Sequence, residues 1–331
     1  VLIAGRNIDR LDWLRTAGNA RAAMFDTPAR IASHPIDLLQ PDAGAELIRK
    51  HAPKVVVQAA SVQTSSVIAD QGSRWSDLVR KGGLSATAIF QSLITRRIAA
   101  AIAAEAPGTP LINCSFPDVV NGMIAAMGYD VLCGTGNVAI LSNIFQGSPG
   151  RPSGDLRVLA QYQCLAPWRR PLCERRGLSA PRVFIDDEEV ADVFSTFEAC
   201  RLTPEPAIEV SGASGVTLML AMIAGKPWRG QVPGPLGLPG GYPVRVAENK
   251  ITLDLPRGGT EAEAIAWNDA FEREKGLTVA DRRASFNGAL RDLLAQEGFA
   301  FADGFDLDDF EEVCHEMMGL RDRLLQSPPT P

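Results

Sequence analysis

The fold of this chain is decided by the stretch Val1-Leu2-Ile3-Ala4-Gly5-Arg6-Asn7. Four apolar residues followed by a glycine predict a short strand over residues 1–5. The residues that follow carry apolar side chains at helical spacing, which predicts a helix over residues 10–23. A strand that passes directly into a helix is the unit from which parallel sheets with crossover helices are built.

An arginine, Arg6, ends this strand. At the end of the second strand of a dinucleotide-binding sheet, an acidic residue binds the ribose of NAD, whereas an arginine accommodates the 2′-phosphate of NADP. A guanidinium is permanently charged and suited to phosphate. We therefore predict NADP as the cofactor, with NAD less favoured, and expect a first strand and a glycine-rich turn before Val1. The alternative is another α/β fold in which Arg6 is a solvated surface residue.

Length and composition describe a globular chain. Its 331 residues are 46% hydrophobic and 22% charged, with a net charge of −6, and this length predicts about two domains. No basic cluster supports nucleic-acid binding, and no apolar run reaches the length of a membrane span. The six cysteines and three histidines lack metal-ligand spacing, so we expect no metal site, structural histidines, and buried thiols in a cytoplasmic protein.

The first half alternates between strand and helix patterns. Strands are predicted over residues 30–37, 54–61, 110–115 and 130–134, helices over 41–51, 85–106, 118–127 and 137–145, and a loop over the polar residues 63–80. The apolar run 54–61 is typical of a parallel strand covered on both faces. We predict an α/β fold with a doubly wound parallel sheet of the Rossmann type over residues 1–146.

A segment rich in glycine, proline and serine, residues 147–154, predicts a linker. Beyond it, strands are predicted over residues 156–165 and 182–185, a hairpin over 242–255, and helices over 207–224 (interrupted at 211–215), 261–275, 284–295 and 307–325; residues 230–241 hold too many glycines and prolines for regular structure. We therefore predict a second, α+β domain over residues 155–331 that binds substrate and forms a dimer.

Several segments, taken in order, carry a family resemblance. They are the long helix at residues 84–107, the strand and turn at 111–120, the glycine-containing segment 131–141, the helix at 208–215 and the late hairpin at 237–255. Their order resembles the lactate/malate dehydrogenase family, and residues 4–7 resemble the saccharopine-dehydrogenase-like group, which prefers NADP. The resemblance implies a Rossmann domain followed by a substrate domain, and a homodimer paired through helices.

The chain departs from the lactate/malate dehydrogenase pattern where that family performs its chemistry. The strand that holds the family's catalytic histidine contains none here, Ile140 and Asn143 stand where its aspartate and arginine belong, and Phe116 replaces the asparagine of the turn. A lactate-type reaction needs an acid for the carbonyl and a guanidinium for the carboxylate. We therefore exclude a 2-hydroxy-acid dehydrogenase and keep the fold.

Ligands bind open parallel sheets at the carboxyl ends of the strands. This rule predicts a set of cofactor-contacting residues at strand ends, namely Gly5, Arg6, Asn7, Ala59, Ala60, Ser61, Ser115, Phe116, Gly134 and Gly136. Asn137, which follows Gly136, is predicted to bind the nicotinamide or the substrate. Its alternative role is to cap the helix that follows.

A carbonyl reduction also needs a proton donor. We predict Tyr162 in this role, with Gln161 and Gln163 able only to orient or polarise the carbonyl. Because side chains alternate along a strand, the two glutamines share one face and Tyr162 takes the other, so only one set faces the site. Asp118 and Glu209 are alternative acids, although Asp118 also fits a helix start.

Two tryptophan-arginine stretches are candidates for substrate contacts. Residues 168–170 can bind an anionic or planar substrate, or form a solvated loop around a buried indole. Lys226, Trp228 and Arg229 precede the glycine-rich segment and are predicted to border the substrate cleft. A loop of this composition serves as a lid or as a rigid connector.

Three functions remain open. The first is an NADP-dependent oxidoreductase that acts on a carbonyl, imine or alcohol of a small metabolite, which rests on Arg6 and the resemblance. The second is a dinucleotide-binding sensor or scaffold subunit without redox turnover, which the missing catalytic residues favour. The third is a redox-assisted epimerase or family 4 glycosidase, which ranks last because Cys114 has no neighbouring histidine in the sequence to complete a metal site.

Overall fold

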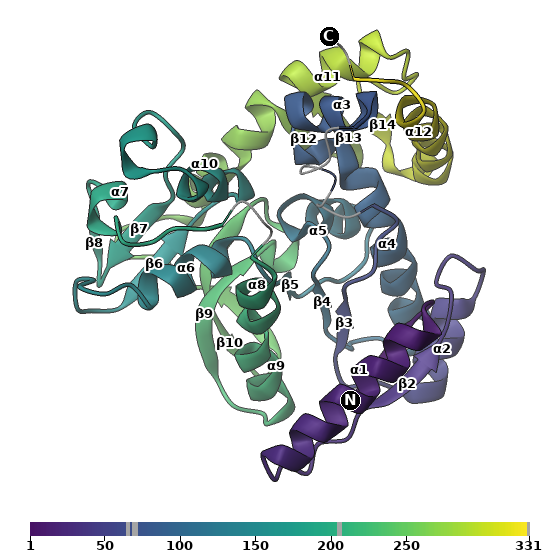
Figure 1. Cartoon of the computed structure of the whole chain (residues 1–331), viewed down its shortest axis with the longest axis horizontal. Coiled ribbons are helices and arrows are strands. Elements are labelled where there is room, and N and C mark those ends of the chain that lie inside the picture. Colours follow the sequence, from purple (N-terminus) through teal and green to yellow (C-terminus); the bar gives the residue numbers. More distant parts are fainter. Residues whose placement is uncertain (64–66, 68–71, 204–206, 330–331) are drawn as a thin grey trace.

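The computed structural model describes residues 1–63, 67, 72–203 and 207–329. Helices and strands are interleaved through these residues in a mixed α/β arrangement (Figure 1). In this part of the chain, no helix combines the length and the apolar character that crossing a membrane requires.

The first half contains two small parallel sheets. β1 (Leu2–Gly5) pairs with β2 (Ala32–Pro35), while β4 (Leu111–Asn113) lies between β3 (Val56–Gln58) and β5 (Cys133–Gly134). Among the described residues, β1 and β3 each have a hydrogen-bonded neighbour on one side only. The prediction of parallel strands with crossover connections is confirmed at this coarse level.

Helices connect the parallel strands. They are α1 (Ile8–Met24), α2 (Ala43–His51), α3 (Arg74–Gly82), α4 (Ala88–Glu105) and α5 (Pro117–Ala126), and α6 (Val138–Gln146) follows β5. The side chain of Asn7 accepts a hydrogen bond from the backbone nitrogen of Arg10 at 2.9 Å and so caps α1. α4 is buried over most of its surface, because its sequence is apolar or small at nearly every position before Arg96.

The second half is built from three antiparallel sheets and six helices of the described chain. The sheets are β6 (Leu156–Leu159) with β7 (Arg182–Ile185) and β8 (Glu188–Glu189); β9 (Trp228–Pro233) with β10 (Gly241–Ala247) and β11 (Lys250–Leu253); and β12 (Gly276–Ala280) with β13 (Arg283–Asn287) and β14 (Phe305–Asp306). The helices are α7 (Val193–Thr196), α8 (Ile208–Ser214), α9 (Val216–Ile223), α10 (Glu261–Glu274), α11 (Gly288–Gln296) and α12 (Phe310–Leu325). A bridge between Ala160 and Gly241 joins the β6 and β10 segments.

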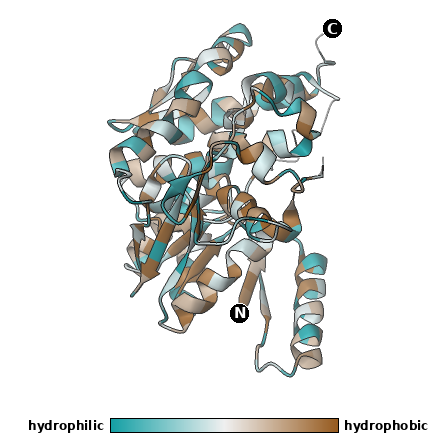
Figure 2. Ribbon diagram, turned by 90° about the vertical axis from the view of Figure 1, so that its left-hand side faces the viewer, coloured by the Kyte–Doolittle hydropathy of each residue, from teal (hydrophilic) through white to brown (hydrophobic). Residues whose placement is uncertain are grey.

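The largest apolar cluster joins parts of the chain that are distant in sequence. It combines residues of α3, α4 and α5 with residues of β12, β13, α11 and α12, and Figure 1 shows α3 beside α11. The strands are mostly apolar, whereas surface helices alternate between polar and apolar segments (Figure 2). The division into residues 1–146 and 155–331 stays a prediction, and residues 147–154 contain no helix or strand.

Four sequence-based expectations for secondary structure were wrong in part. Residues 63–80, predicted as a loop, include the start of α3, because Ser73 and Ser76 form a capping box there; the rest of that loop lies largely outside the described residues. The strand predicted over 156–165 ends at Leu159 and a 3₁₀ helix, Tyr162–Arg169, follows. Residues 230–241 include most of β9, and the helix predicted over 284–295 begins at Gly288, after β13.

The cysteines also differ from expectation. Cys173 is exposed and Cys114 is half-buried, while the other four are buried. The prediction of buried thiols was therefore wrong for these two residues.

Candidate functional site

Side-chain amides shape the carboxyl ends of β3 and β4. The Gln58 side chain accepts a hydrogen bond from the Ala60 nitrogen at 2.6 Å, and the Asn113 side chain accepts one from the Ser115 nitrogen at 2.9 Å. Both amides therefore bond the backbone two residues ahead and turn the chain away from the strand. The Thr95 hydroxyl lies between them, 2.9 Å from Gln58 Nε2 and 3.3 Å from Asn113 Oδ1, which ties the two turns to α4.

These turns bring together most of the predicted cofactor residues of the second parallel sheet. Ala59 and Ala60 are exposed, Ser61 is half-exposed, and Ser115 Oγ donates to the Ala60 carbonyl oxygen at 3.3 Å. The edge of the sheet is therefore lined by small side chains that leave the backbone open to a ligand.

The two predicted glycines at the end of β5 have packing roles. A Cβ on Gly134 would lie 2.1 Å from Pro117 Cβ, and a Cβ on Gly136 would lie 2.7 Å from Ser211 Oγ. The Gly136 nitrogen also donates to Ser214 Oγ at 3.1 Å. These glycines let α5 and α8 approach the end of β5 closely.

The predicted residues Gly5, Arg6 and Asn7 belong to the other parallel sheet. Gly5 pairs with Pro35 at the end of β1, and Asn7 caps α1. Arg6 is exposed and forms no hydrogen bond or ion pair with any described residue. No backbone pairing connects β1 with β3 among the described residues, so the two groups of predicted residues stand on separate sheets.

Two residues of the site adopt left-handed backbone conformations that favour glycine. Phe116 has φ 48° and Asn137 has φ 46°, and they precede the first residues of α5 and α6. Such conformations in residues other than glycine cost free energy and gather at functional sites. They bring Asn137 against Asp118, so that Asn137 Nδ2 donates to Asp118 Oδ2. The Asn137 side chain does not cap α6.

Asp118 is a buried acid of α5. It is 1% exposed, and burial raises the pKa of its carboxyl from 3.8 to about 6, although the hydrogen bond from Asn137 opposes the rise. Its second oxygen, Oδ1, has no hydrogen-bond partner among the described residues. Asp118 therefore exchanges a proton close to neutral pH.

A second buried acid, Glu272, comes from α10. Its carboxylate accepts hydrogen bonds from Ser85 Oγ at 2.6 Å, from Gln161 Nε2 at 2.7 Å and from the Leu277 nitrogen at 2.7 Å. Burial nevertheless raises the pKa of Glu272 from 4.5 to about 7, and the charge of Asp118 adds to the rise. The cost of burying the charge thus outweighs the three hydrogen bonds.

Tyr162 lies between these two acids. Its ring meets the Phe116 ring edge-on, with the centres 4.8 Å apart, and its hydroxyl is 3.5 Å from Ser85 Oγ. Burial raises the pKa of Tyr162 well above its usual value, so the phenol stays protonated. We call Ser85, Asp118, Asn137, Gln161, Tyr162 and Glu272 the acid cluster.

The expectation that only Tyr162 or the two glutamines face the site was wrong. The chain leaves the strand after Leu159, so alternation no longer applies at residues 161–163. Gln161 Oε1 instead accepts a hydrogen bond from the Gln163 nitrogen at 2.7 Å and starts the 3₁₀ helix. Gln161 and Tyr162 both reach the acid cluster.

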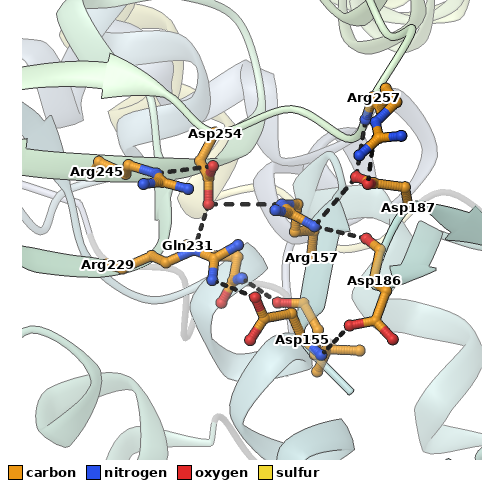
Figure 3. A network of polar contacts seen from close by, with 10 residues as sticks. Asp155, Arg157, Asp186, Asp187, Arg229, Gln231, Arg245, Asp254 and Arg257 are labelled. Atoms are coloured by element: carbon orange, nitrogen blue, oxygen red, sulfur yellow. Dashed lines mark hydrogen bonds and ion pairs between the residues drawn. The ribbon is translucent and has the colours of Figure 1, made fainter.

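The predicted contacts at Trp228 and Arg229 fall in a different place. These residues line a polar pocket of about 290 Å³ with Asn143, Ser214 and Gln231. Arg229 is held by Asp155, at 2.6 Å, and by Asp254. Figure 3 shows that Asp254 also faces Arg157 and Arg245, at 3.5 and 2.9 Å, so the arginines are neutralised within the protein. Of the remaining candidates, Glu209 is exposed on α8 and Trp168 is fully buried.

Comparison with known proteins leaves this site to be interpreted from its geometry. No protein-family model matches the chain, and no curated protein matches it. Among the described residues, no three histidine, cysteine, aspartate or glutamate side chains gather in a way that can hold a metal ion.

Sequence reasoning missed Glu272 and Ser85. Glu272 shares a buried helix face with Ala264 and Asn268, each four residues apart, while the apolar residues of α10 indicate a different face. Ser85 lies in the short 3₁₀ helix Leu84–Thr87 before α4. A polar residue on a buried helix face leaves no signal in the sequence until its partners are known.

Proposed function

We propose that this chain is an NADP-dependent oxidoreductase that acts on a carbonyl, imine or alcohol of a small metabolite. The observation that carries the proposal is the arrangement of its parallel strands. Rossmann sheets have the strand order 3-2-1-4-5-6. The pairs β2-β1 and β3-β4-β5 match this order on either side of its first strand, and the edges of β1 and β3 have no hydrogen-bonded neighbour among the described residues.

Exposed apolar side chains on these strands support the same order. Leu2 of β1 is 37% exposed and Val57 of β3 is 43% exposed. Residues of this type in short parallel strands are normally covered. The strand predicted before Val1 would pair with the free edges of β1 and β3 if it lay between them, and a crossover helix following it would cover these side chains. Its glycine-rich turn would then face the cofactor.

The residues at the carboxyl ends fit NADP. Arg6 is exposed and has no hydrogen-bond or ion-pair partner among the described residues, as expected of a guanidinium that binds the 2′-phosphate. Ala59 and Ala60 present an open backbone where the rest of the cofactor would lie. When bound, the reduced cofactor supplies a hydride.

The acid cluster would supply the accompanying proton. Glu272, with a pKa of about 7, keeps its proton close to neutral pH, where Asp118, with a pKa of about 6, is already mostly ionised; a pKa near the working pH is the one at which a general acid is most effective. The Tyr162 hydroxyl lies near Ser85, which donates a hydrogen bond to Glu272, and Asn137 at the end of β5 donates a hydrogen bond to Asp118. These contacts connect the two acids to the ends of the strands. This assignment extends the predicted set Tyr162, Gln161, Gln163 and Asn137 by two carboxyl groups.

Titration calorimetry of the full-length protein with NADPH and NADH tests the proposal. Arg6→Ala should weaken NADPH binding by about tenfold to a hundredfold, because hydrogen bonds to charged groups contribute about 1.5–3 kcal/mol. NADH affinity should change little, and Arg10→Ala, which removes another exposed guanidinium of the same segment, should leave NADPH affinity unchanged. Absence of NADPH binding by the unmodified protein would remove the basis of the proposal.

A dinucleotide sensor without redox turnover is the second candidate. It is favoured by the burial of both acids, since Asp118 is 1% and Glu272 is 2% exposed. Transfer of deuterium from labelled NADPH to any carbonyl substrate distinguishes the two, because a sensor binds the cofactor without transferring the label.

A further inference from the structure

Arg175 is buried in a part of the chain to which the proposed function assigns no role. It follows the 3₁₀ helix Leu172–Glu174 and only 2% of it is exposed. A guanidinium stays protonated at physiological pH. A permanent positive charge is therefore enclosed here.

The protein provides this charge with two backbone acceptors and one aromatic ring. Nε donates to the Arg170 carbonyl oxygen at 3.0 Å, and Nη2 donates to the Cys200 carbonyl oxygen at 2.9 Å. The guanidinium carbon lies 4.7 Å from the centre of the Trp168 ring, a cation–π contact. No described carboxylate forms an ion pair with Arg175, and the nearby Arg201 lowers the pKa of its guanidinium further.

Two buried donors at this place have no acceptor among the described residues. They are Nη1 of Arg175 and the indole Nε1 of Trp168, whose side chain is fully buried. Buried donors in native proteins are nearly always satisfied. Because the guanidinium lies over the indole, the two donors belong to one small region.

The surrounding charge has the same sign. Arg170 and Arg176 are exposed close by in the sequence, and Glu174 is the one acid between residues 162 and 178. A concentration of positive charge attracts small anions from solution.

We propose that one small anion of halide size binds between Arg175 and Trp168. It would accept hydrogen bonds from Nη1 and Nε1 and neutralise the enclosed guanidinium. The burial of both side chains favours a halide over larger oxyanions. This site is independent of the proposed cofactor.

The anion would stabilise the segment that carries part of the acid cluster. Trp168 and Arg175 hold residues 161–175 against Phe145 of α6, whose ring centre is 4.7 Å from that of Trp168, and against the backbone of Cys200 and Leu202. Gln161 and Tyr162 begin this segment. Removal of the anion is therefore expected to loosen the side of the acid cluster that these two residues form.

Thermal unfolding of the full-length protein, followed by circular dichroism, tests the site. Sodium chloride is compared with sodium gluconate at equal ionic strength, with bromide and phosphate as further arms. We expect chloride and bromide to raise the unfolding midpoint in a saturable manner and phosphate to act like gluconate. Arg175→Met should abolish the halide effect, whereas Arg176→Met, a change of the exposed neighbour, should preserve it.

A second variant covers the case in which Arg175→Met does not fold. Trp168→Phe keeps an aromatic ring beneath the guanidinium, removes the indole donor and makes the buried side chain smaller, so the apparent Kd for chloride should rise about tenfold or more, as for loss of one hydrogen bond to a charged group. Equal midpoints in chloride and gluconate for the unmodified protein overturn the proposal. So does stabilisation by phosphate alone.

Discussion

Replacement of Glu272 by glutamine isolates the effect of burying its carboxyl group. The substitution keeps the size of the side chain and one carbonyl oxygen, but it removes the titratable proton. One of the three hydrogen bonds to the carboxylate, from Ser85, Gln161 or the Leu277 nitrogen, loses its acceptor. That loss costs about 1 kcal/mol at every pH, so the diagnostic quantity is how stability changes with pH.

The magnitude follows from the pKa. The pKa of Glu272 is 4.5 in the unfolded chain and about 7 in the folded protein, and a difference of this size corresponds to about 3 kcal/mol. Between these two pH values the folded protein keeps a proton that the unfolded chain releases. The free energy of unfolding therefore falls as the pH rises from about 4.5 to about 7, and it levels off above that range.

Other groups must be separated from this effect. The raised pKa of Asp118, about 6, lowers stability with rising pH in the same direction, whereas the lowered pKa of His34 acts in the opposite direction. Both residues are present in the unmodified protein and in Glu272→Gln. The contribution of His34 cancels in the difference between the two curves, whereas that of Asp118 cancels only in part, because its charge interacts with Glu272.

Urea denaturation followed by circular dichroism between pH 5 and 8.5 measures the effect. Relative to the unmodified protein, Glu272→Gln should gain about 2–3 kcal/mol in unfolding free energy between the two ends of this range. Glu274→Gln, an exposed carboxylate on the same helix, should show no such gain. Parallel curves for the unmodified protein and Glu272→Gln would refute the reasoning.

Two further predictions concern stability and use the same denaturation assay. Gly240→Ala should destabilise the protein by about 2–4 kcal/mol, because φ at Gly240 is +72° and an added Cβ would lie 2.3 Å from Asn268 Cγ. The control Gly258→Ala, where φ is +85° and the space around the residue is open, should cost about 1 kcal/mol. Equal losses of stability in the two variants would contradict the predicted clash with Asn268. Asp254→Asn should lower the free energy of unfolding by about 2–3 kcal/mol, because this carboxylate, only 7% exposed, forms ion pairs with Arg157, Arg229 and Arg245. The control Asp308→Asn removes an exposed ion pair with Arg282 and should cost under about 1 kcal/mol. A larger loss in Asp308→Asn than in Asp254→Asn would show that the ion pairs of Asp254 do not stabilise the fold.

The sequence predicted the elements whose patterns are long or clearly bounded. β7 has the predicted bounds of residues 182–185, the hairpin of β10 and β11 was expected, and α10 begins at the predicted residue, because Thr260 and Glu263 form a capping box there. These signals are local, since each depends on side chains within a few residues of one another.

Other elements depend on interactions that the pattern does not show. Residues 161–165 look like the continuation of a strand, but the Gln161 side chain bonds the Gln163 nitrogen and turns the chain. The sequence of α3 does contain a helix signal, because Trp75, Leu78 and Val79 lie at helical spacing after the N-cap residue Ser73 and form a buried face. The many polar residues around them led instead to the prediction of a loop. A helical period of this kind decides in favour of a helix even in a polar segment.

The acid cluster could be predicted only in part. Asn137 was predicted because it follows a strand of a parallel sheet, where ligands bind, while Tyr162 and Gln161 were predicted as groups that donate a proton or orient the carbonyl, with Asp118 as an alternative acid. Glu272 lies on α10, far along the chain from Asp118. Its helix packs against β12, and its carboxylate accepts a hydrogen bond from Ser85, whose 3₁₀ helix packs against α3. No periodicity encodes such a meeting of segments.

The two acids of the cluster have different environments, and this difference assigns them different tasks. Glu272 accepts three hydrogen bonds and still has the higher pKa, about 7, so it holds its proton at a pH where Asp118, with a pKa of about 6, has lost its own. Ser85 Oγ lies 2.6 Å from Glu272 and 3.5 Å from the hydroxyl of Tyr162, which packs on Phe116. Under the proposed function, Tyr162 would donate its hydroxyl proton to the substrate and the glutamic acid would return a proton to the phenol through Ser85. In the proposed function Glu272 would therefore store the proton and Tyr162 would deliver it, while Asp118 accepts a hydrogen bond from Asn137, which has a positive φ at the end of β5.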